Sequence, residues 1–466
     1  MNDIARFRRV LGRRDTLALA FGAIIGWSWV LLTGRGVTTG GAGGAMLAFV
    51  LGGIAMIFIG LVYAELAAAI PRAGGEHVYS LRAFGPGIAF VCTWALLLAY
   101  ITVVAFESVA LGTALDYLVP QLRGPTLWQV AGVAVHAGWT VIGIAVAVAM
   151  IAVNVVGIRP AAVLQTIVTV VIVLSGLVFA TGTIGAGEPA NLEPWFGPAA
   201  TGWLAVLVMV PTIYVGFDVI PQAAEEIALP AREIGIVIVA SVVMAMVFYV
   251  TMILGVGLTF PRESLAGLAL PTADAAAAAW GGRWAAVVML MGGIAGILTS
   301  WNAFIVGASR VVWSLATHGV VPAWLGDLHP RYGTPWKAVI AVGVFACLSP
   351  LAGRTILVAL INAGSFALVI AYALVAASFL RLRRAEPALP RPFRAGAGEW
   401  VGWIALTLAL ALSLVYLPGS PAALAWPWEW AICLGWALAG AVLLVFGRRQ
   451  ERQRAMSVDR TSRRID

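Results

Sequence analysis

The chain contains few charged residues for its length. Asp, Glu, Lys and Arg make up 11% of its 466 residues, whereas 61% are hydrophobic. A soluble domain carries about 25% charged residues, so this composition excludes an ordinary soluble enzyme. The apolar residues fall in blocks of about 20, the length of a helix that crosses about 30 Å of hydrocarbon. The composition therefore predicts an all-α integral membrane protein.

Cysteine and histidine are also scarce. Cys92, Cys347 and Cys433 lie inside apolar blocks without a partner at metal-ligand spacing, and the four histidines are scattered. This pattern predicts no disulfide framework, no metal site and no cofactor. The sequence also lacks a nucleophile–base pair and a phosphate-binding loop, so it does not predict an enzyme. A basic N-terminal stretch leads directly into a full-length span, which argues against a cleavable signal peptide.

Twelve apolar segments are predicted to span the membrane. They are expected at 16–34, 45–69, 87–117, 138–156, 161–183, 201–228, 234–258, 284–317, 337–352, 355–380, 400–418 and 424–447. The stretch 127–135 is a candidate interfacial helix, and the polar segment after Phe446 is expected to be a disordered tail.

The distribution of positive charge predicts the orientation of these spans. With a cytoplasmic N-terminus, 23 Lys and Arg residues lie on the cytoplasmic side and five lie on the other side. Positive residues favour the cytoplasm, so both termini are expected there, in a prokaryote-like plasma membrane. The same distribution explains the net charge of +8 without a nucleic-acid partner.

Two of the spans contain residues that interrupt a helix. The first span carries Gly22, Gly26, Trp27 and Ser28, and the sixth carries Pro211 and Gly216. Unpaired backbone groups in hydrocarbon cost several kcal/mol, so such a break is tolerated only where protein or a water-filled cavity covers it. Each break falls in the first helix of a run of five, which is typical of a secondary transporter built from two inverted repeats.

The spacing predicts a division of the chain into five segments. These are a cytoplasmic segment at 1–14, a first five-helix repeat at 15–183, a second, inverted repeat at 200–380, two further helices at 400–447, and a cytoplasmic basic tail at 448–466. The two halves show no obvious sequence identity to each other, so the repeat rests on topology and on the positions of the breaks.

The first break offers N–H groups at Gly26 to Ser28 and the positive end of a half-helix, which suit a carboxylate. The alternative is that Gly26 only allows close helix packing. The second break frees carbonyls from Ile213 to Gly216, which suit an ammonium group, and its alternative is a proline kink without a ligand. The matching positions of the two breaks favour the functional interpretation.

Several motifs resemble the amino acid–polyamine–organocation (APC) superfamily of permeases, of the amino acid permease type. They are Gly-Ala-Ile-Ile-Gly at 22–26, Tyr-Ala-Glu-Leu-Ala-Ala-Ala-Ile-Pro-Arg-Ala-Gly-Gly at 63–75, Gly-Phe-Asp at 216–218, Ala-Glu-Glu at 224–226 with Pro230 and Arg232, and Asn302 with Ser309-Arg310. The resemblance covers about 16–340 and implies an inverted-repeat fold with discontinuous first and sixth spans that bind the carboxylate and the amine of a substrate.

The chain departs from that superfamily at three places. Gly26-Trp27-Ser28 stands where Gly-Ser-Gly is usual, and Thr212 stands where many members have an aromatic gate. Ile172 occupies the place of a lysine that substitutes for sodium in some members. The identity of the substrate and of the coupling ion therefore does not follow from the resemblance.

The predicted substrate site combines both breaks with one polar residue of the eighth span. Its residues are Ile25, Gly26, Trp27, Ser28, Trp29, Thr212, Ile213, Tyr214, Val215, Gly216 and Asn302. Asn302 is a candidate pocket or cation ligand.

Ionisable residues within spans are functional candidates because they are costly in a membrane. Asp218 is predicted to couple or gate transport, and its alternative is a bond to frayed backbone. Glu107 is predicted to meet a cation or a proton, or else to anchor two helices. Glu65, Glu225, Glu226 and Arg310 share one depth near the cytoplasm and are predicted to form one ion-pair network, either an inner gate or a permanent structural cluster.

These observations predict a secondary active transporter that moves an amino acid or a similar small amine by alternating access. Proton symport is the first expectation, ahead of exchange or sodium coupling. An amine or polyamine permease, whose pocket would use Glu107, is the nearer alternative, and a non-transporting membrane sensor is the more distant one. The expected partners are the substrate, protons or sodium, and the lipid bilayer.

Overall fold

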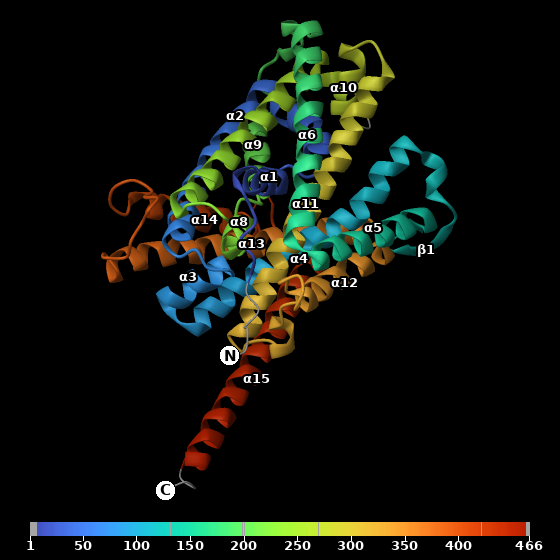
Figure 1. Cartoon of the computed structure of the whole chain (residues 1–466). Coiled ribbons are helices and arrows are strands. Elements are labelled where there is room, and N and C mark those ends of the chain that lie inside the picture. The colour runs from blue at the N-terminus through green and yellow to red at the C-terminus, as the bar shows by residue number, and fades with distance from the viewer. Residues whose placement is uncertain are drawn as a thin grey trace.

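The computed structural model describes residues 7–130, 132–197, 199, 201–268, 270–420 and 422–462. Helices dominate it (Figure 1). The α-helices are α1 Arg13–Ile24, α2 Ser28–Ala69, α3 Gly75–Phe84, α4 Pro86–Leu118, α5 Ala137–Val156, α6 Ile158–Ala186, α7 Gly202–Ile213, α8 Val219–Gln222, α9 Ala231–Thr259, α10 Pro271–Ala279, α11 Arg283–Thr317, α12 Trp336–Ala352, α13 Thr355–Ala385, α14 Trp400–Leu414 and α15 Trp428–Ser462. Five 3₁₀ segments are η1 Pro120–Arg123, η2 Pro189–Leu192, η3 Ala224–Glu226, η4 Arg262–Gly267 and η5 Ala323–Gly326.

Eight of the described helices are long and apolar enough to cross a membrane, and three shorter apolar helices are α7, α12 and α14. Their surfaces match a lipid environment. Along α6, the side chains of one face are more than half exposed, and all of them are aliphatic: Val163, Ile167, Val170, Leu174 and Leu177. Exposed apolar stripes of this length are unfavourable in water, so the helices belong to a multi-pass membrane protein.

The long helix α2 contains the end of the first predicted span and the whole of the second. Its backbone leaves helical geometry at Gly41, where φ is 75°. Only glycine adopts such an angle readily. The chain therefore turns between the two predicted spans without a separate loop.

Two central helices organise the packing of the others. α2 packs against α7 and α9, and α11 packs against α4 and α6. The small helix α3 lies between α2 and α4 in the chain and packs against α4 and α13. This arrangement surrounds the interruption between α1 and α2 with protein on several sides.

The candidate interfacial helix at 127–135 is wrong. The structure has an antiparallel hairpin there, with β1 at Thr126–Val130 and β2 at Val133–His136. Gly132 has a φ of 79°, which suits a tight turn between strands. The Thr, Trp and Val residues of this segment favour strands over a helix.

The disordered tail expected after Phe446 also differs from the structure. α15 continues as a helix to Ser462 and projects away from the other helices (Figure 1). Residues 1–6 and 463–466 of the predicted terminal segments lie outside the described residues.

Candidate functional site

The two predicted helix interruptions are present, and they touch each other. α1 ends at Ile24 and α2 begins at Ser28, while α7 ends at Ile213 and α8 begins at Val219. Gly216 has a φ of 136°, and a methyl group added to it would lie 2.6 Å from the carbonyl carbon of Ala23. Both interruptions therefore contribute backbone to one place in the protein.

Helix α11 covers the first interruption from another side. A methyl group on Gly296 would lie 2.3 Å from the carbonyl oxygen of Gly26. Thr299 donates its hydroxyl to the carbonyl of Ile25 at 3.4 Å. The unwound backbone is thus covered by protein, as a membrane interior requires.

A pocket of about 450 Å³ opens beside the two interruptions. Six predicted substrate-site residues line it: Gly26, Trp27, Ser28, Thr212, Ile213 and Val215. A pocket of this size accommodates a small organic solute. The interruptions and the pocket together define a candidate substrate site.

Glu107 of α4 contributes a carboxyl group to this pocket. Its side chain is 2% exposed, and its Oε1 would lie 3.2 Å from a methyl group on Gly26. Ser300 of α11 lines the pocket beside this carboxyl group, and Oε2 has no hydrogen-bond partner among the described residues. A buried polar atom without a partner is costly, which makes Glu107 a candidate to receive a hydrogen bond from a bound molecule or to bind a proton.

The other predicted substrate-site residues lie near the pocket without lining it. Ile25 is fully buried between α1 and α11. Trp29 is also fully buried, and its ring packs edge-on against Phe248 with 5.5 Å between the ring centroids. Gly216 faces the end of α1.

Tyr214 points away from the pocket as well. Its hydroxyl donates to the carbonyl of Phe49 at 3.2 Å, and its ring packs against Phe49 and Tyr249. Its side chain therefore supports the second interruption from behind.

Asn302 is held in a polar network of α5, α6 and α11. Its Nδ2 donates to Gln165 Oε1 at 2.8 Å, and its Oδ1 accepts from Asn154 Nδ2 at 2.9 Å. Gln165 in turn donates to the carbonyl of Ala18. This network connects α11 to α1, and Asn302 is not among the residues that line the pocket.

Asp218 is fully buried and accepts three hydrogen bonds. Tyr100 donates to Oδ2 at 2.7 Å, Tyr372 donates to Oδ1 at 3.3 Å, and the N–H of Gly216 donates to Oδ1 at 2.9 Å. The bond from Gly216 shows that Asp218 does support the interrupted backbone. The two tyrosines connect it also to α4 and α13.

The predicted ion-pair network of Glu65, Glu225, Glu226 and Arg310 is present only as the pair of Glu226 and Arg310, whereas Glu65 and Glu225 contact other arginines. Their partners come from separate parts of the chain. Glu226 pairs with Arg310 at 2.8 Å in a fully buried bidentate contact, and Glu225 lies 3.9 Å from the exposed Arg72.

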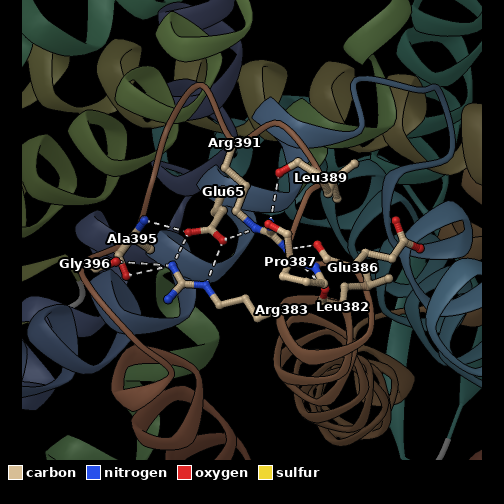
Figure 2. Close-up of polar contacts among 9 residues, drawn as sticks. All are labelled: Glu65, Leu382, Arg383, Glu386, Pro387, Leu389, Arg391, Ala395 and Gly396. Atoms are coloured by element: carbon tan, nitrogen blue, oxygen red, sulfur yellow. Dashed lines mark hydrogen bonds and ion pairs between the residues drawn. The ribbon is translucent and has the colours of Figure 1, made fainter.

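Glu65 instead holds the segment between α13 and α14 (Figure 2). Arg383 contacts both of its carboxylate oxygens, and Arg391 lies 3.0 Å from Oε1. The N–H of Ala395 donates to Oε2 at 2.7 Å. Residues more than 300 positions apart form this cluster, which sequence spacing does not reveal.

Several pocket residues were not predicted from the sequence. They are Ser300 and Phe304 of α11, Val103 and Phe106 of α4, Val358, Ile361 and Asn362 of α13, and Tyr416, Ala422 and Ala423 near the end of α14. Tyr249 was missed too, although its hydroxyl lies 2.8 Å from Ser28 Oγ and donates to the carbonyl of Ile24. The sequence offered one indication of this role, since Tyr249 is a tyrosine within an otherwise apolar predicted span.

The interrupted helices, the pocket and the apolar surface define a multi-pass membrane transporter. Comparison with known families agrees, because residues 11–446 match the family described as Amino acid permease. The chain belongs to this family, whose members are transporters.

Three relatives illustrate the range of proteins to which the chain is similar. It is 28% identical to the branched-chain amino acid permease BcaP of Bacillus subtilis, over 87% of this chain and 88% of that protein. It is 25% identical to the methylthioribose transporter of the same organism, over 83% and 84% of the two chains. It is also 25% identical to the aspartate-proton symporter of that organism, over 84% of this chain and 76% of that protein.

Proposed function

We propose that the protein is a secondary active transporter that moves an amino acid across the plasma membrane by alternating access with proton symport. The observation that carries this proposal is the contact of two helix interruptions beside a pocket that contains the Glu107 carboxyl group. Exposed backbone groups bind the charged ends of small solutes in transporters with broken helices. The similarity to the aspartate-proton symporter supports proton coupling.

We assign the two charged groups of the substrate to the two interruptions. N–H groups of Gly26 to Ser28 bind the carboxylate, and carbonyls from Ile213 to Gly216 bind the amine together with Glu107. The remaining walls include Val103, Phe106 and Phe304, and such apolar walls favour an uncharged, apolar side chain. The similarity to a branched-chain amino acid permease supports the same class of substrate.

The proposed architecture has twelve spans with both termini in the cytoplasm. It contains two inverted repeats of five spans, at 15–183 and 200–380, followed by two spans at 400–447 and the tail at 448–466. With this topology, the pocket residues Tyr416, Ala422 and Ala423 lie toward the outside. In this proposal, the Glu226–Arg310 and Glu65–Arg383 contacts close the cytoplasmic side, and we assign this conformation to an outward-facing state.

Asp218 and Glu107 are the proposed proton-handling groups. Glu107 faces the pocket, whereas Asp218 lies directly behind the second interruption and is connected to α4 and α13 by Tyr100 and Tyr372. A change in the protonation of Asp218 alters the bond to the Gly216 N–H, which couples a proton to the shape of the site.

Uptake of radiolabelled amino acids into proteoliposomes, with and without an imposed proton gradient, tests this proposal. We expect neutral apolar amino acids to accumulate when the outside is more acidic. Asp218→Asn is expected to abolish the dependence of uptake on pH while substrate binding persists, and an unchanged pH dependence would contradict the role of Asp218.

The nearer alternative, an amine or polyamine permease, has one specific observation in its favour. The unpartnered Oε2 of Glu107 suits a cation that lacks a carboxylate. Under this alternative, Glu107→Gln weakens basic substrates selectively, whereas an equal loss for neutral amino acids supports the amino acid transporter.

A further inference from the structure

A second buried carboxyl group, outside the pocket, has no role in the proposed binding of substrate. Glu76 lies on α3, between the second and third predicted spans, and is fully buried. Its Oε2 accepts a hydrogen bond from Gln222 Nε2. Its Oε1 and the Oε1 of Gln222 are both buried without partners in the described part of the chain.

The groups around Glu76 come from five elements. Gln222 of α8 contacts Glu76, and Tyr63 of α2 lies beside it. Tyr79 of α3, Cys92 and Tyr100 of α4, Tyr372 of α13 and the carboxyl group of Asp218 are near enough to interact with it electrostatically. The hydroxyl of Tyr63 lies next to the Glu76 carboxyl group without a hydrogen bond of ordinary geometry, and the hydroxyl of Tyr79 has no partner among the described residues.

The neighbouring histidine does not supply a positive charge. His77 is 2% exposed, its Nδ1 lies 2.8 Å from Thr93 Oγ1, and its ring lies 4.5 Å from that of His318. Burial and the facing His318 lower the pKa of His77 to about 3, so its imidazole is neutral. The guanidinium groups of Arg310 and Arg383 are already paired with Glu226 and Glu65.

A charged carboxylate in these surroundings would be buried without a cation, which is strongly unfavourable. Burial raises the pKa of the Glu76 carboxyl group well above its usual range, and the charge of Asp218 adds to this effect. A protonated Glu76 has an O–H donor. The oxygen and nitrogen of the Gln222 amide can exchange places by a half-turn of the side-chain amide. In the turned orientation the amide oxygen faces Glu76 and accepts a hydrogen bond from its O–H group.

The surroundings of Glu76 and Asp218 therefore differ in the number of hydrogen-bond donors that they offer to the carboxyl group. Asp218 accepts three hydrogen bonds, whereas Glu76 accepts one from a side chain, so Glu76 has fewer donors to stabilise a negative charge. The ring of Tyr63, which lies beside Glu76, packs 5.6 Å from the ring of Tyr372, whose hydroxyl donates to Asp218. Two interacting carboxyl groups titrate as a pair, and one of them keeps its proton.

We propose that Glu76 is a proton-binding site, which holds the proton of a carboxyl pair with Asp218 that is joined through Tyr63 and Tyr372. This inference rests on the proposed proton symport and adds a site on the cytoplasmic side of the pocket. The proposed step breaks only the O–H bond of Glu76. When α3 and α8 separate, the proton passes from Glu76 to cytoplasmic water, and the resulting carboxylate is hydrated.

Infrared difference spectroscopy of the full chain in detergent tests this site without substrate or transport. Near neutral pH, the wild type is expected to show the C=O stretch of protonated buried carboxylic acids. Glu76→Gln is expected to lose one such band, and Glu107→Gln identifies any band that belongs to the pocket carboxyl group. Glu386→Gln, at an exposed cytoplasmic carboxylate paired with Arg82, is the matched control and is expected to keep the band. A spectrum of Glu76→Gln that keeps every carboxylic acid band of the wild type overturns the proposal.

Thermal unfolding as a function of pH is the second measurement. A carboxyl group whose pKa is raised on folding stabilises the protein below its unfolded pKa, and this contribution is lost as the pH rises through the folded pKa. The melting temperature of the wild type is therefore expected to fall above neutral pH, and that of Glu76→Gln is expected to fall less. Identical pH profiles overturn the proposal.

A second variant keeps the test decisive if Glu76→Gln does not fold. Tyr63→Phe retains the ring that packs against Tyr372 and removes the hydroxyl beside Glu76. It is expected to shift the frequency of the carboxylic acid band, and an unshifted band overturns the connection through Tyr63. If the band behaves as expected but a proton gradient does not drive uptake, proton symport fails while the Glu76 site stands.

Discussion

Gly216 and Ala23 meet where the two helix interruptions touch, and the contact leaves no room for a side chain on Gly216. A methyl group there would lie 2.6 Å from the Ala23 carbonyl carbon, and the backbone of Gly216 has a φ of 136°. The backbones of the first and sixth predicted spans are therefore in direct contact at the candidate site.

Gly216→Ala is expected to abolish substrate binding and transport. The added methyl group forces α1 away from the second interruption, and overpacking of this kind costs about 1–3 kcal/mol in addition to the strain of the backbone angle. Uptake into proteoliposomes and substrate-induced thermal shift are the measurements. Gly185→Ala is the matched control, because nothing lies within 4 Å of a methyl group at that helical position. Equal activity of the two variants would show that the contact is not required.

Glu65→Gln is expected to destabilise the protein strongly. It removes the negative charge that two guanidinium groups share at a site where the Glu65 side chain is 1% exposed. Breaking a buried ion pair costs about 3–5 kcal/mol, since it leaves a buried charge without compensation. The melting temperature in detergent and the rate of proteolysis within 386–399 measure this effect.

The exposed pair of Arg384 and Glu399 supplies the control for Glu65. Glu399→Gln is expected to leave both the melting temperature and the proteolysis rate close to those of the wild type, because exposed ion pairs contribute little. If Glu65→Gln behaves like Glu399→Gln, the Glu65 cluster does not hold the segment between α13 and α14.

The sequence predicted the positions of the interruptions better than the directions of their side chains. Gly26 and Gly216 permit backbone that other residues resist, so they were identifiable without coordinates. Once the backbone unwinds, helical periodicity no longer indicates where a side chain points, and Trp29 and Tyr214 therefore face away from the pocket. The pocket residues of α13 and the arginine partners of Glu65 could not be predicted, because they depend on tertiary packing between distant segments.

Asn302→Ala is expected to lower stability without changing the affinity for substrate. The change removes the bond from Asn154 and leaves the buried Oε1 of Gln165 without its donor, while the bonds of these two side chains to the carbonyls of Met150 and Ala18 remain. An unsatisfied buried polar group costs about 1–3 kcal/mol. The comparison of melting temperature with the KM of uptake is decisive. A raised KM at unchanged stability would place Asn302 in the substrate site.

The pH dependence of stability at the surface pair of Arg82 and Glu386 is expected to be weak. Hydrogen bonding to Arg82 lowers the pKa of Glu386, so its contribution to stability is present above the unfolded pKa and is lost as the pH falls through the folded pKa. Because both side chains are partly exposed, water and salt screen the pair. Melting curves of Arg82→Gln and the wild type at mildly acidic pH are expected to coincide, and a large difference would reveal a structural role for this contact.

The central claim is that an amino acid binds in the pocket between the two interruptions, and blocking this pocket tests it most directly. Thr212 lines the pocket and donates its hydroxyl to the carbonyl of Met209. Thr181, on the exposed face of α6, makes the same kind of bond to its own helix and serves as the control. We would measure equilibrium binding of radiolabelled neutral amino acids to purified Thr212→Trp, Thr181→Trp and wild type. The account predicts that only Thr212→Trp loses binding while its melting temperature is maintained, and undiminished binding to this variant would contradict it.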